Sequence, residues 1–336
     1  MTTERSRSTG RPTLDQVAER AGVGRGTVSR VVNGSAQVSP SAKAAVEDAI
    51  AELGYVPNRA ARTLVTQRTD SIALVIFESG ERFFAEPFFG RIVQSIASVL
   101  VERNLQMVLM ISQSAQERER LEGYLTRQHV DGALLLSLHG EDTLLSKLEQ
   151  RGVATVRAGR PPRAEPGCFV DADNRGGARE AVEYLRRAGR RRIATITGPM
   201  DMAPGLARLD GYRDVVGEGI VAHGDFSEES GAAAMAWLLD RHPDIDAVFA
   251  ASDMMAAGAL RAMRERGRSA PDDIAVIGFD DSVIARHTDP PLTSVHQPIE
   301  EMGRQMVRLL LAKIDGEDPG PGGPVLSTRL VLRGSA

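Results

Sequence analysis

A pair of short helical patterns near the N-terminus constrains the fold of this chain more than any other feature. Residues 13–33 read TLDQVAERAGVGRGTVSRVVN. In the first half, apolar residues recur at i, i+3, i+4 and i+7, the spacing of one face of an α-helix. Thr13 can cap this helix with Gln16 at the capping-box position, and the glycines at residues 22–24 interrupt it. The apolar face consists of Leu14, Val17, Ala18 and Ala21.

The second half of the stretch predicts another short helix, with valines on one face and polar residues on the other. Two short helices joined by a glycine-containing turn form a helix-turn-helix, whose second helix enters the major groove of DNA. A nucleotide-binding glycine loop would need a strand before it rather than a helix. A helical hairpin with a solvated face is the other alternative. The valines are Val28, Val31 and Val32, and the polar face carries Gly26, Ser29, Arg30 and Asn33, with Arg25 at the helix start.

A third helix and a short isolated one follow. Ser39 and Pro40 are a typical helix start, Gly54 is a typical helix end, and the apolar positions between them form one stripe. Three helices enclose a core of about 45 residues, which is marginal for an independent fold. Residues 59–65 have a short helical pattern without a neighbouring element to pack on, and a helix of this length is unstable alone. A plain linker is the alternative interpretation of residues 58–69.

Composition and charge restrict the class of protein. The chain has 336 residues, 42% of them apolar and 26% charged, as expected for a soluble protein of two or three domains. We expect no membrane span and no secretory signal, and the single cysteine, Cys168, fits a reducing cytoplasm. Residues 1–69 contain ten Lys and Arg against six Asp and Glu, a net charge of +4, whereas the remainder carries −8. A basic head on an acidic body is consistent with DNA binding at one end.

Apolar runs alternate with helical patterns from Ser71 to the C-terminus, which predicts βαβ units and parallel sheets. The first series ends near residue 156 and a second begins at Cys168, so two lobes with a cleft between them are expected. Residues 293–298 would cross back, and the helix near 299–314 would rejoin the first lobe. Ligands of open α/β sheets bind beyond the carboxyl ends of the strands, which draws attention to Ser252, Asp253, Asp280 and Asp281.

At this point the sequence resembles the lactose-repressor (LacI/GalR) family of bacterial transcription regulators. The resemblance is carried by GVGRGTVSRVVNGS at residues 22–35 and YVPNRAARTLV at residues 55–65, and it extends over nearly the whole chain. It implies an all-α helix-turn-helix headpiece followed by an α/β sensor of the periplasmic-binding-protein type. The expected divisions are an arm at 1–12, the headpiece at 13–56, a hinge helix and linker at 57–69, and an effector-binding and dimerisation domain at 70–336. The first lobe would comprise about 70–167 and 299–325, and the second about 168–298 and 326–333.

The resemblance also implies which residues contact DNA. The hinge helix is expected to fold when two copies pair in the minor groove at the operator centre, with Leu64 as the wedge that opens a base step. The predicted DNA-binding residues are Thr13, Leu14, Arg25, Gly26, Thr27, Ser29, Arg30, Asn33, Gln37, Tyr55, Asn58, Ala61 and Leu64.

In the sensor, the resemblance assigns effector contacts to residues after the strands. FFAEPFF, treated as a loop, contains four of the nine phenylalanines, of which Phe89 matches a family contact while Phe83, Phe84 and Phe88 are expected to pack. Asp280 is expected to contact the effector and Asp281 to cap a helix. Arg157 stands where several relatives have an acidic residue that contacts the effector. The resemblance therefore does not indicate which hydroxyl groups of the effector are recognised at this position. The predicted effector-binding residues are Phe89, Arg157, Arg208, Phe226, Ser252, Asp253 and Asp280.

Other stretches, among them ATITGPMDM and HGDFSEESG, resemble actinobacterial regulators of cellulose and β-glucoside use. The expected function is therefore a homodimeric repressor that binds an inverted-repeat operator in double-stranded DNA and is released by a sugar, such as a cello-oligosaccharide. The resemblance implies neither cofactor nor metal. A carbohydrate-active enzyme is an alternative, but it would need two carboxylates that face one bond, about 5 to 9.5 Å apart. Asp280 and Asp281 are adjacent, and adjacent residues of a strand point to opposite faces. A transport binding protein would leave the headpiece unexplained.

Overall fold

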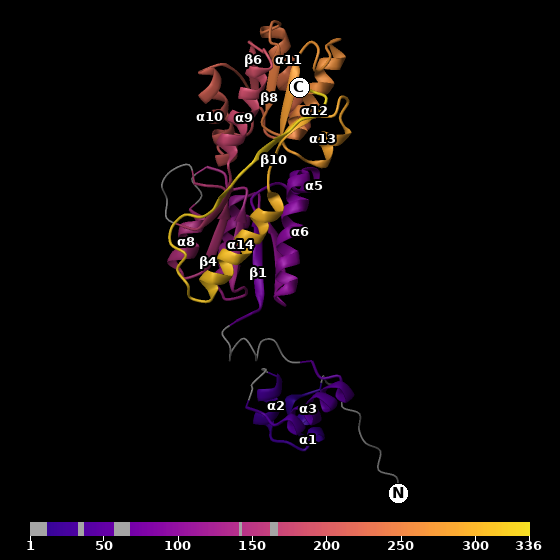
Figure 1. The fold of residues 1–336 in the computed structure, drawn as a ribbon. Coiled ribbons are helices and arrows are strands. Elements are labelled where there is room, and N and C mark those ends of the chain that lie inside the picture. The colour runs from indigo at the N-terminus through magenta and orange to yellow at the C-terminus, as the bar shows by residue number, and fades with distance from the viewer. Residues whose placement is uncertain (1–11, 33–36, 57–67, 141–142, 162–166) are drawn as a thin grey trace. The chain divides into compact units, whose positions relative to one another are not determined.

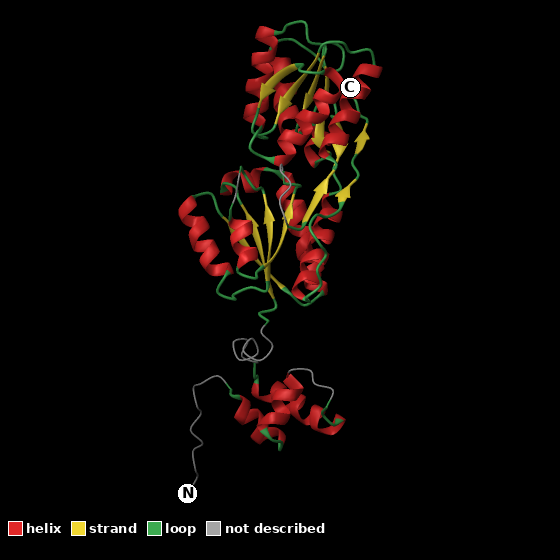
Figure 2. Cartoon of the chain, turned by 90° about the vertical axis from the view of Figure 1, so that its left-hand side faces the viewer, coloured by secondary structure: helices red, strands yellow, loops and turns green. Residues whose placement is uncertain are grey.

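A computed structural model describes residues 12–32, 37–56, 68–140, 143–161 and 167–336. The chain forms two compact units, Met1–Thr69 and Asp70–Ala336, which are described separately here as headpiece and sensor. The headpiece is all-α, and the sensor contains two α/β lobes (Figures 1 and 2).

The headpiece contains the three predicted helices, and each begins and ends for a local reason. Thr13 and Gln16 form a capping box at the start of α1, and Gly22 ends the helix with a φ of +66°, a conformation that favours glycine. Ser39 caps α3, and Gly54 ends it. Val17, Val28, Val46, Ala49 and Tyr55 are buried between the helices. The helices are α1 (Leu14–Ala21), α2 (Arg25–Val32) and α3 (Pro40–Leu53).

The first lobe of the sensor is built on a six-stranded parallel sheet in the order β11-β5-β4-β3-β1-β2. Helices cover both faces of β1 and β3, and these two strands are almost entirely apolar, as buried parallel strands usually are. Its strands are β1 (Ser71–Ile76), β2 (Gln106–Ile111), β3 (Gly132–Leu136), β4 (Ala154–Ala158), β5 (Phe169–Ala172) and β11 (Val325–Leu326).

Successive residues of β1 point to opposite helical layers. Ile72, Leu74 and Ile76 pack against α6 and α14, whereas Ala73 and Val75 pack against α7 and α8. The helix α14 thus returns late in the chain to cover the first lobe, as expected, and it lies beside α6 (Figure 1). The helices are α5 (Gly80–Ala85), α6 (Pro87–Glu102), α7 (Ala115–Leu125), α8 (Leu144–Gln150) and α14 (Ile299–Ile314).

The second lobe repeats this architecture with the order β12-β10-β9-β8-β6-β7, in which only β12 is antiparallel to its neighbour. One helical layer consists of α9 (Asn174–Arg187) and α10 (Ala203–Val216), and the other of α11 (Glu228–Arg241), α12 (Asp253–Glu265) and α13 (Val283–His287). The strands are β6 (Ile193–Thr197), β7 (Ile220–His223), β8 (Ala247–Ala250), β9 (Ala275–Asp280), β10 (Thr293–His296) and β12 (Arg329–Val331).

The chain crosses between the lobes after β5, after β10 and between β11 and β12. The first crossover differs from the expectation that the second lobe begins at Cys168. β5 instead pairs in parallel with β4, through Arg157 with Phe169 and Ala158 with Val170, so the first lobe extends to Ala172. A strand that begins a new run in the sequence can still complete the preceding sheet, because strand pairing is a tertiary property.

Three short elements, α5, β7 and β11, were absent from the expected pattern. FFAEPFF is not a loop: α5 ends at Ala85 and α6 begins at Pro87, a favourable first position in a helix. The short strands β7 and β11 lie at sheet edges, where few residues are needed to pair. The helix α13 has its N-cap at Ser282, so Asp281 does not have the capping role expected of it.

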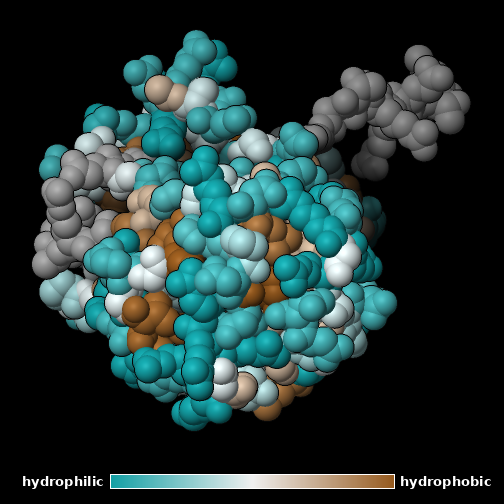
Figure 3. All heavy atoms as spheres, turned by 90° about the horizontal axis from the view of Figure 1, so that it is seen from above, coloured by the Kyte–Doolittle hydropathy of each residue, from teal (hydrophilic) through white to brown (hydrophobic). Residues whose placement is uncertain are grey.

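The surface shows where apolar side chains escape burial. The face in Figure 3 is mostly hydrophilic, with small separate apolar areas rather than one continuous patch. Exposed large apolar residues in the second lobe include Trp237, Val283 and Leu332. Within the described ranges, none of the helices is both long and apolar enough to cross a lipid bilayer.

Candidate functional site: a helix-turn-helix face and an interlobe cleft

The second headpiece helix presents its polar face to solvent. Arg25, Gly26 and Arg30 are exposed on α2, while Thr27 and Ser29 are half-buried. Gln37 is exposed just before α3. Such a face can reach base edges from the N-terminal end of a recognition helix. Four further predicted DNA-binding residues, Asn33, Asn58, Ala61 and Leu64, lie outside the described residues.

The other predicted DNA-binding residues have structural contacts within the headpiece. Thr13 is exposed at the cap of α1, where its hydroxyl accepts from the Gln16 backbone N–H at 3.3 Å. Leu14 packs against the core, and Tyr55 is buried in it. Arg25 lies 3.6 Å from Asp15, but both side chains are more than two-thirds exposed, so this ion pair contributes little stability.

The sensor contains a cleft of about 950 Å³, counting its open mouth, lined by both lobes. It lies at the carboxyl ends of strands from each sheet, where ligands of α/β proteins bind. All seven predicted effector-binding residues line it: Phe89 and Arg157 from the first lobe, and Arg208, Phe226, Ser252, Asp253 and Asp280 from the second.

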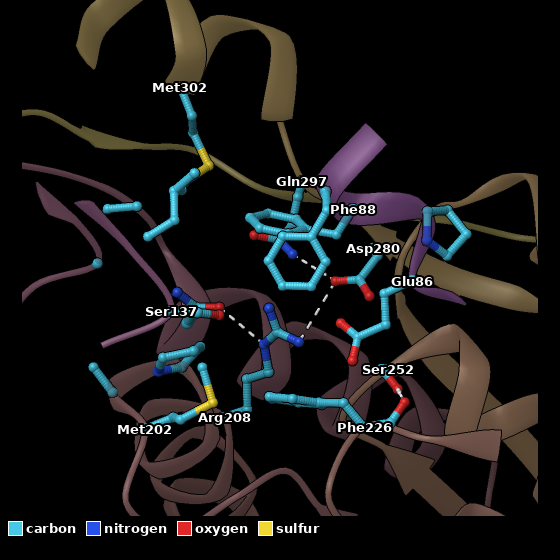
Figure 4. A pocket seen from close by; sticks show the side chains of 18 of the residues that line it. Glu86, Phe88, Ser137, Met202, Arg208, Phe226, Ser252, Asp280, Gln297 and Met302 are labelled. Atoms are coloured by element: carbon cyan, nitrogen blue, oxygen red, sulfur yellow. Dashed lines mark hydrogen bonds and ion pairs between the residues drawn. The ribbon is translucent and has the colours of Figure 1, made fainter. Parts of the chain in front are cut away.

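Arg208, on α10, is held by several acceptors at the centre of the cleft wall (Figure 4). Its Nε donates to Asn174 Oδ1 at 2.8 Å, and its Nη1 donates to the carbonyl of Ala251 at 2.5 Å and lies 3.5 Å from Asp280 Oδ1. The guanidinium also lies 3.7 Å above the ring centroid of Phe279. A planar fork fixed in this way presents donors to a ligand in one orientation.

The phenylalanines of residues 83–89 have different environments. Phe89 is buried and lines the cleft wall, Phe83 packs beneath it, and Phe88 also lines the cleft. Phe84 is 82% exposed, which contradicts the expectation that it packs. Because α5 and α6 are helical here, adjacent residues point in different directions, a distinction that a loop interpretation could not make.

Phe226 supplies an aromatic surface from the second lobe. It has a φ of +75°, and its ring occupies the space directly over Gly198, where a Cβ atom would lie 2.2 Å from the ring. The guanidinium of Arg82 from the first lobe lies 5.5 Å from the ring centroid, and that of Arg208 lies 5.6 Å from it. Aromatic faces and fixed polar donors together suit a ligand with apolar C–H faces and hydroxyl edges.

Burial changes the acidity of the cleft carboxyls. Burial raises the pKa of Glu86 to about 7, against the opposing effect of Arg82, whose Nε donates to it at 2.5 Å. Burial also raises the pKa of Asp280, although Arg208 and the amide of Gln297 act in the opposite direction. The pKa of Asp253 is raised by burial and by the nearby Asp280. These shifts follow from removing charged groups from water.

The adjacent acids at the end of β9 have separate roles. Asp280 faces the cleft, where it accepts from Gln297 Nε2 at 2.5 Å. Asp281 instead pairs with Arg333 and with His296, and its pKa is lowered because these hydrogen bonds outweigh its burial. Its carboxylate is therefore a structural group within the second lobe.

The remaining cleft residues, Arg157, Ser252 and Asp253, differ in how they are held within the protein. Arg157 is buried on β4. Ser252 caps α12, accepting from the Met255 backbone N–H at 3.2 Å. Asp253 accepts from the Ser282 N–H at 2.6 Å and from Ser294 Oγ at 2.5 Å, so most of its hydrogen-bonding capacity is used inside the second lobe.

Residues of the cleft that sequence reasoning missed come mainly from outside the strand ends. Gln297 lies in the segment that was expected to cross between lobes, which was a usable signal. Asn174 follows the first crossover, and its position was obscured because β5 was assigned to the wrong lobe. The missed lining residues include Arg82, Glu86, Phe88, Asn174, Met202, Gln297 and Met302.

Two family models match the chain. The model for "Bacterial regulatory proteins, lacI family" matches residues 13–58, and the model for a "Periplasmic binding protein-like domain" matches residues 182–336. The chain is 55% identical to the HTH-type transcriptional regulator CelR of Thermobifida fusca, over 97% of this chain and 98% of that one. It is 33% identical to the regulator AscG of Escherichia coli K12, over 96% and 98% of the two chains.

Solved structures agree in fold. A CelR–cellobiose complex superposes with a TM-score of 0.77 at 53% identity, covering 97% of this chain and 100% of that one. A lac repressor dimer bound to operator and the anti-inducer ONPF superposes with a TM-score of 0.87 at 28% identity, covering 97% and 99%.

The headpiece and the two-lobed sensor define a DNA-binding transcriptional regulator with a ligand cleft, not an enzyme. The chain belongs to the LacI family of bacterial regulatory proteins, and within it the chain is similar to CelR.

Proposed function

We propose that this protein is a homodimeric transcriptional repressor whose cleft binds cellobiose or a related short β-glucoside, and that the sugar releases it from operator DNA. The observation that carries the sugar assignment is the combination of Phe88, Phe226 and the fixed Arg208–Asp280 pair in one cleft between the lobes. The similarity to a regulator solved with cellobiose supports the same class of ligand.

The mechanism follows from linkage between two binding events. A sugar that contacts both lobes favours the closed cleft, and it releases DNA only if the closed form binds the operator less tightly. Phe88 from the first lobe and Arg208 and Phe226 from the second supply contacts on both sides. The seven predicted effector-binding residues are proposed to act here, with Asp253 and Arg157 shaping the wall.

The DNA half of the proposal rests on the exposed face of α2 and the basic charge of residues 1–69. Two copies would place two such helices on the half-sites of an inverted repeat, since a two-fold protein reads a two-fold site. Arg25 and Arg30 are the exposed cations of this face, and arginine can donate to both acceptors of a guanine edge.

Sugar titration tests the proposal. In calorimetry, the full chain should bind cellobiose or cellotriose more tightly than maltose or lactose. In fluorescence anisotropy on an operator selected from random DNA, the preferred sugar should release the protein. Arg208→Lys should bind the sugar at least about tenfold more weakly, because charge-assisted hydrogen bonds contribute about 1.5–3 kcal/mol each. It should still bind the operator.

Arg213→Lys is the matched control, since Arg213 lies on the same helix and pairs only at the surface, 3.5 Å from Glu218. It should behave like the unmodified protein in both assays. If sugar still released Arg208→Lys from the operator normally, the cleft assignment would be rejected. If none of the four sugars released the unmodified protein from DNA, the proposed ligand class would be rejected.

A further inference from the structure

A histidine next to the cleft joins the two lobes through two carboxylates. His139 follows β3 in the first lobe, and its Nδ1 lies 2.9 Å from Asp201 Oδ2, in the segment before α10 of the second lobe. Its Nε2 lies 3.2 Å from Glu78 Oε1, just after β1 of the first lobe. Beside it, the Gly140 N–H donates to the carbonyl of Asp201 at 2.8 Å. The ring therefore lies at a direct contact between lobes.

Hydrogen-bond chemistry determines the protonation state of this arrangement. Ionised carboxylates only accept hydrogen bonds, and a neutral imidazole has a single N–H to donate. Both contacts of His139 are satisfied at once by the imidazolium, which donates from each nitrogen. Hydrogen bonds to Glu78 and Asp201 raise the pKa of His139, the Glu78 bond most strongly, although burial opposes them.

The charged groups that face the ring come from three packed segments. Glu78 is buried after β1, and it also lies 3.2 Å from Arg82 of α5, which is shared with Glu86. Asp201 belongs to the second lobe and its side chain is 56% exposed. Glu78 and Arg82 stay with His139 when the lobes separate, because all three belong to the first lobe. Asp201 is the partner that a separation of the lobes would remove.

We propose that His139 is a positioning residue for effector binding: a protonated clamp that holds the lobes together, so that closure of the cleft takes up protons. This inference rests on the proposed function, in which sugar favours the closed cleft. His139 is not among the residues that line the cleft. The clamp acts by changing the balance between open and closed forms, which changes the apparent affinity for any ligand of the closed form.

The sign of the pH dependence follows from the two states. In the open form His139 has lost Asp201, so its pKa is lower than in the closed form. The stabilisation of the closed form is complete below the open-form pKa and is lost as pH rises through the closed-form pKa. Sugar affinity should therefore fall as pH rises from about 6 to about 8.5, a range that spans histidine titration. Because Asp201 is half exposed, we expect the sugar affinity to change by about three- to tenfold. The upper value corresponds to a difference of about one unit between the pKa values of His139 in the open and closed forms.

Calorimetric titration of the full chain with cellobiose at about pH 6 and about pH 8.5 tests the clamp. Between these two pH values, the affinity of the unmodified protein for cellobiose should fall about three- to tenfold more than that of His139→Gln or Asp201→Asn. His129→Gln is the control, because His129 is an exposed first-lobe histidine whose ring stacks on Tyr124. Glu86, whose pKa burial raises to about 7, also titrates in this range, and it is retained in every variant.

Two readouts separate this inference from the proposed function. Titrations near pH 7 in buffers of different ionisation enthalpy should show proton uptake that His139→Gln lacks. Without sugar, thermal midpoints should fall between about pH 6 and about pH 8.5 more in the unmodified protein than in either clamp variant. If cellobiose does not bind, the proposed ligand is wrong and the thermal series alone decides on the clamp. Identical pH profiles in the unmodified protein and Asp201→Asn would overturn the clamp.

Discussion

Arg208 and Asp280 are fixed before any ligand is bound, because each has other partners within the protein. Arg208 donates to Asn174 and to the carbonyl of Ala251, while Asp280 accepts from Gln297. Side chains held in this way lose little conformational entropy when a ligand arrives, so that more of the interaction energy appears as affinity. The helix α2 is different: its arginines are exposed, and in the proposed function their partners are on DNA.

Arg25 allows a prediction about DNA specificity. Arg25→Ala should lose roughly 1–3 kcal/mol of discrimination at one base pair of the half-site, the contribution of a bidentate contact. The fold should survive, since its ion pair with Asp15 is highly exposed. Selection from random DNA should return a half-site relaxed at that position.

Arg20→Ala provides the control for this experiment. Arg20 lies on α1 and pairs with Glu52 at the surface of the headpiece. Its removal should leave the selected half-site unchanged. An unchanged half-site in Arg25→Ala as well would mean that Arg25 does not read bases.

Helix pairs in the second lobe approach closely because glycines lie between them. A Cβ atom on Gly258 of α12 would lie 2.0 Å from the carbonyl oxygen of Glu228 at the start of α11. A Cβ atom on Gly231 of α11 would lie 2.2 Å from the carbonyl oxygen of Met255. The contact is backbone against backbone, so a small side-chain rotation cannot relieve it.

Gly258→Ala should therefore destabilise the sensor by about 1–3 kcal/mol, the usual cost of forcing extra volume into a packed interior. In an open helix the same change stabilises by up to about 1 kcal/mol, since alanine has the higher helix propensity. Gly123→Ala in α7 is the matched control, because a Cβ atom there meets nothing within 4 Å. Urea unfolding followed by circular dichroism should give opposite signs for the two variants. A stabilised Gly258→Ala variant would show that α11 and α12 can separate without cost.

The whole molecule consists of a small headpiece and a large sensor with separate cores. The headpiece core is formed by Val17, Val28, Val46 and a few neighbours, whereas each lobe of the sensor has apolar layers on both faces of its sheet. A core of the headpiece size is marginal, and the sensor is large enough to fold alone.

A fragment of residues 70–336 should therefore fold and bind the effector by itself. Every residue that lines the cleft lies within it. We expect its affinity for cellobiose to lie within about twofold of the full chain, a difference of less than 0.5 kcal/mol, and its operator binding to be lost. Calorimetry and anisotropy on both proteins measure this. A fragment that folds but binds the sugar more than about tenfold more weakly would show that the headpiece contributes to the cleft.

The sequence alone determined the features that depend on neighbouring residues. Caps at Thr13 and Ser39, the turn at Gly22 and the alternation of strands and helices are local, so the element pattern and the helix-turn-helix could be predicted. The rule that ligands lie beyond strand ends, together with the family resemblance, also selected seven effector residues. The structure places all seven in one cleft.

Tertiary structure decided what depends on pairing between distant segments. The residues of β5 and their neighbours in sequence do not indicate that β5 joins the first sheet. Its partners, β4 and the edge strand β11, come next to it only in the folded chain. The helical form of residues 80–89 likewise decided that Phe88 lines the cleft while Phe84 faces solvent. The contact of His139 with Asp201 joins residues 62 positions apart in different lobes. Such a contact exists only once both lobes have folded and met, so the pattern of residues around either one could not indicate it.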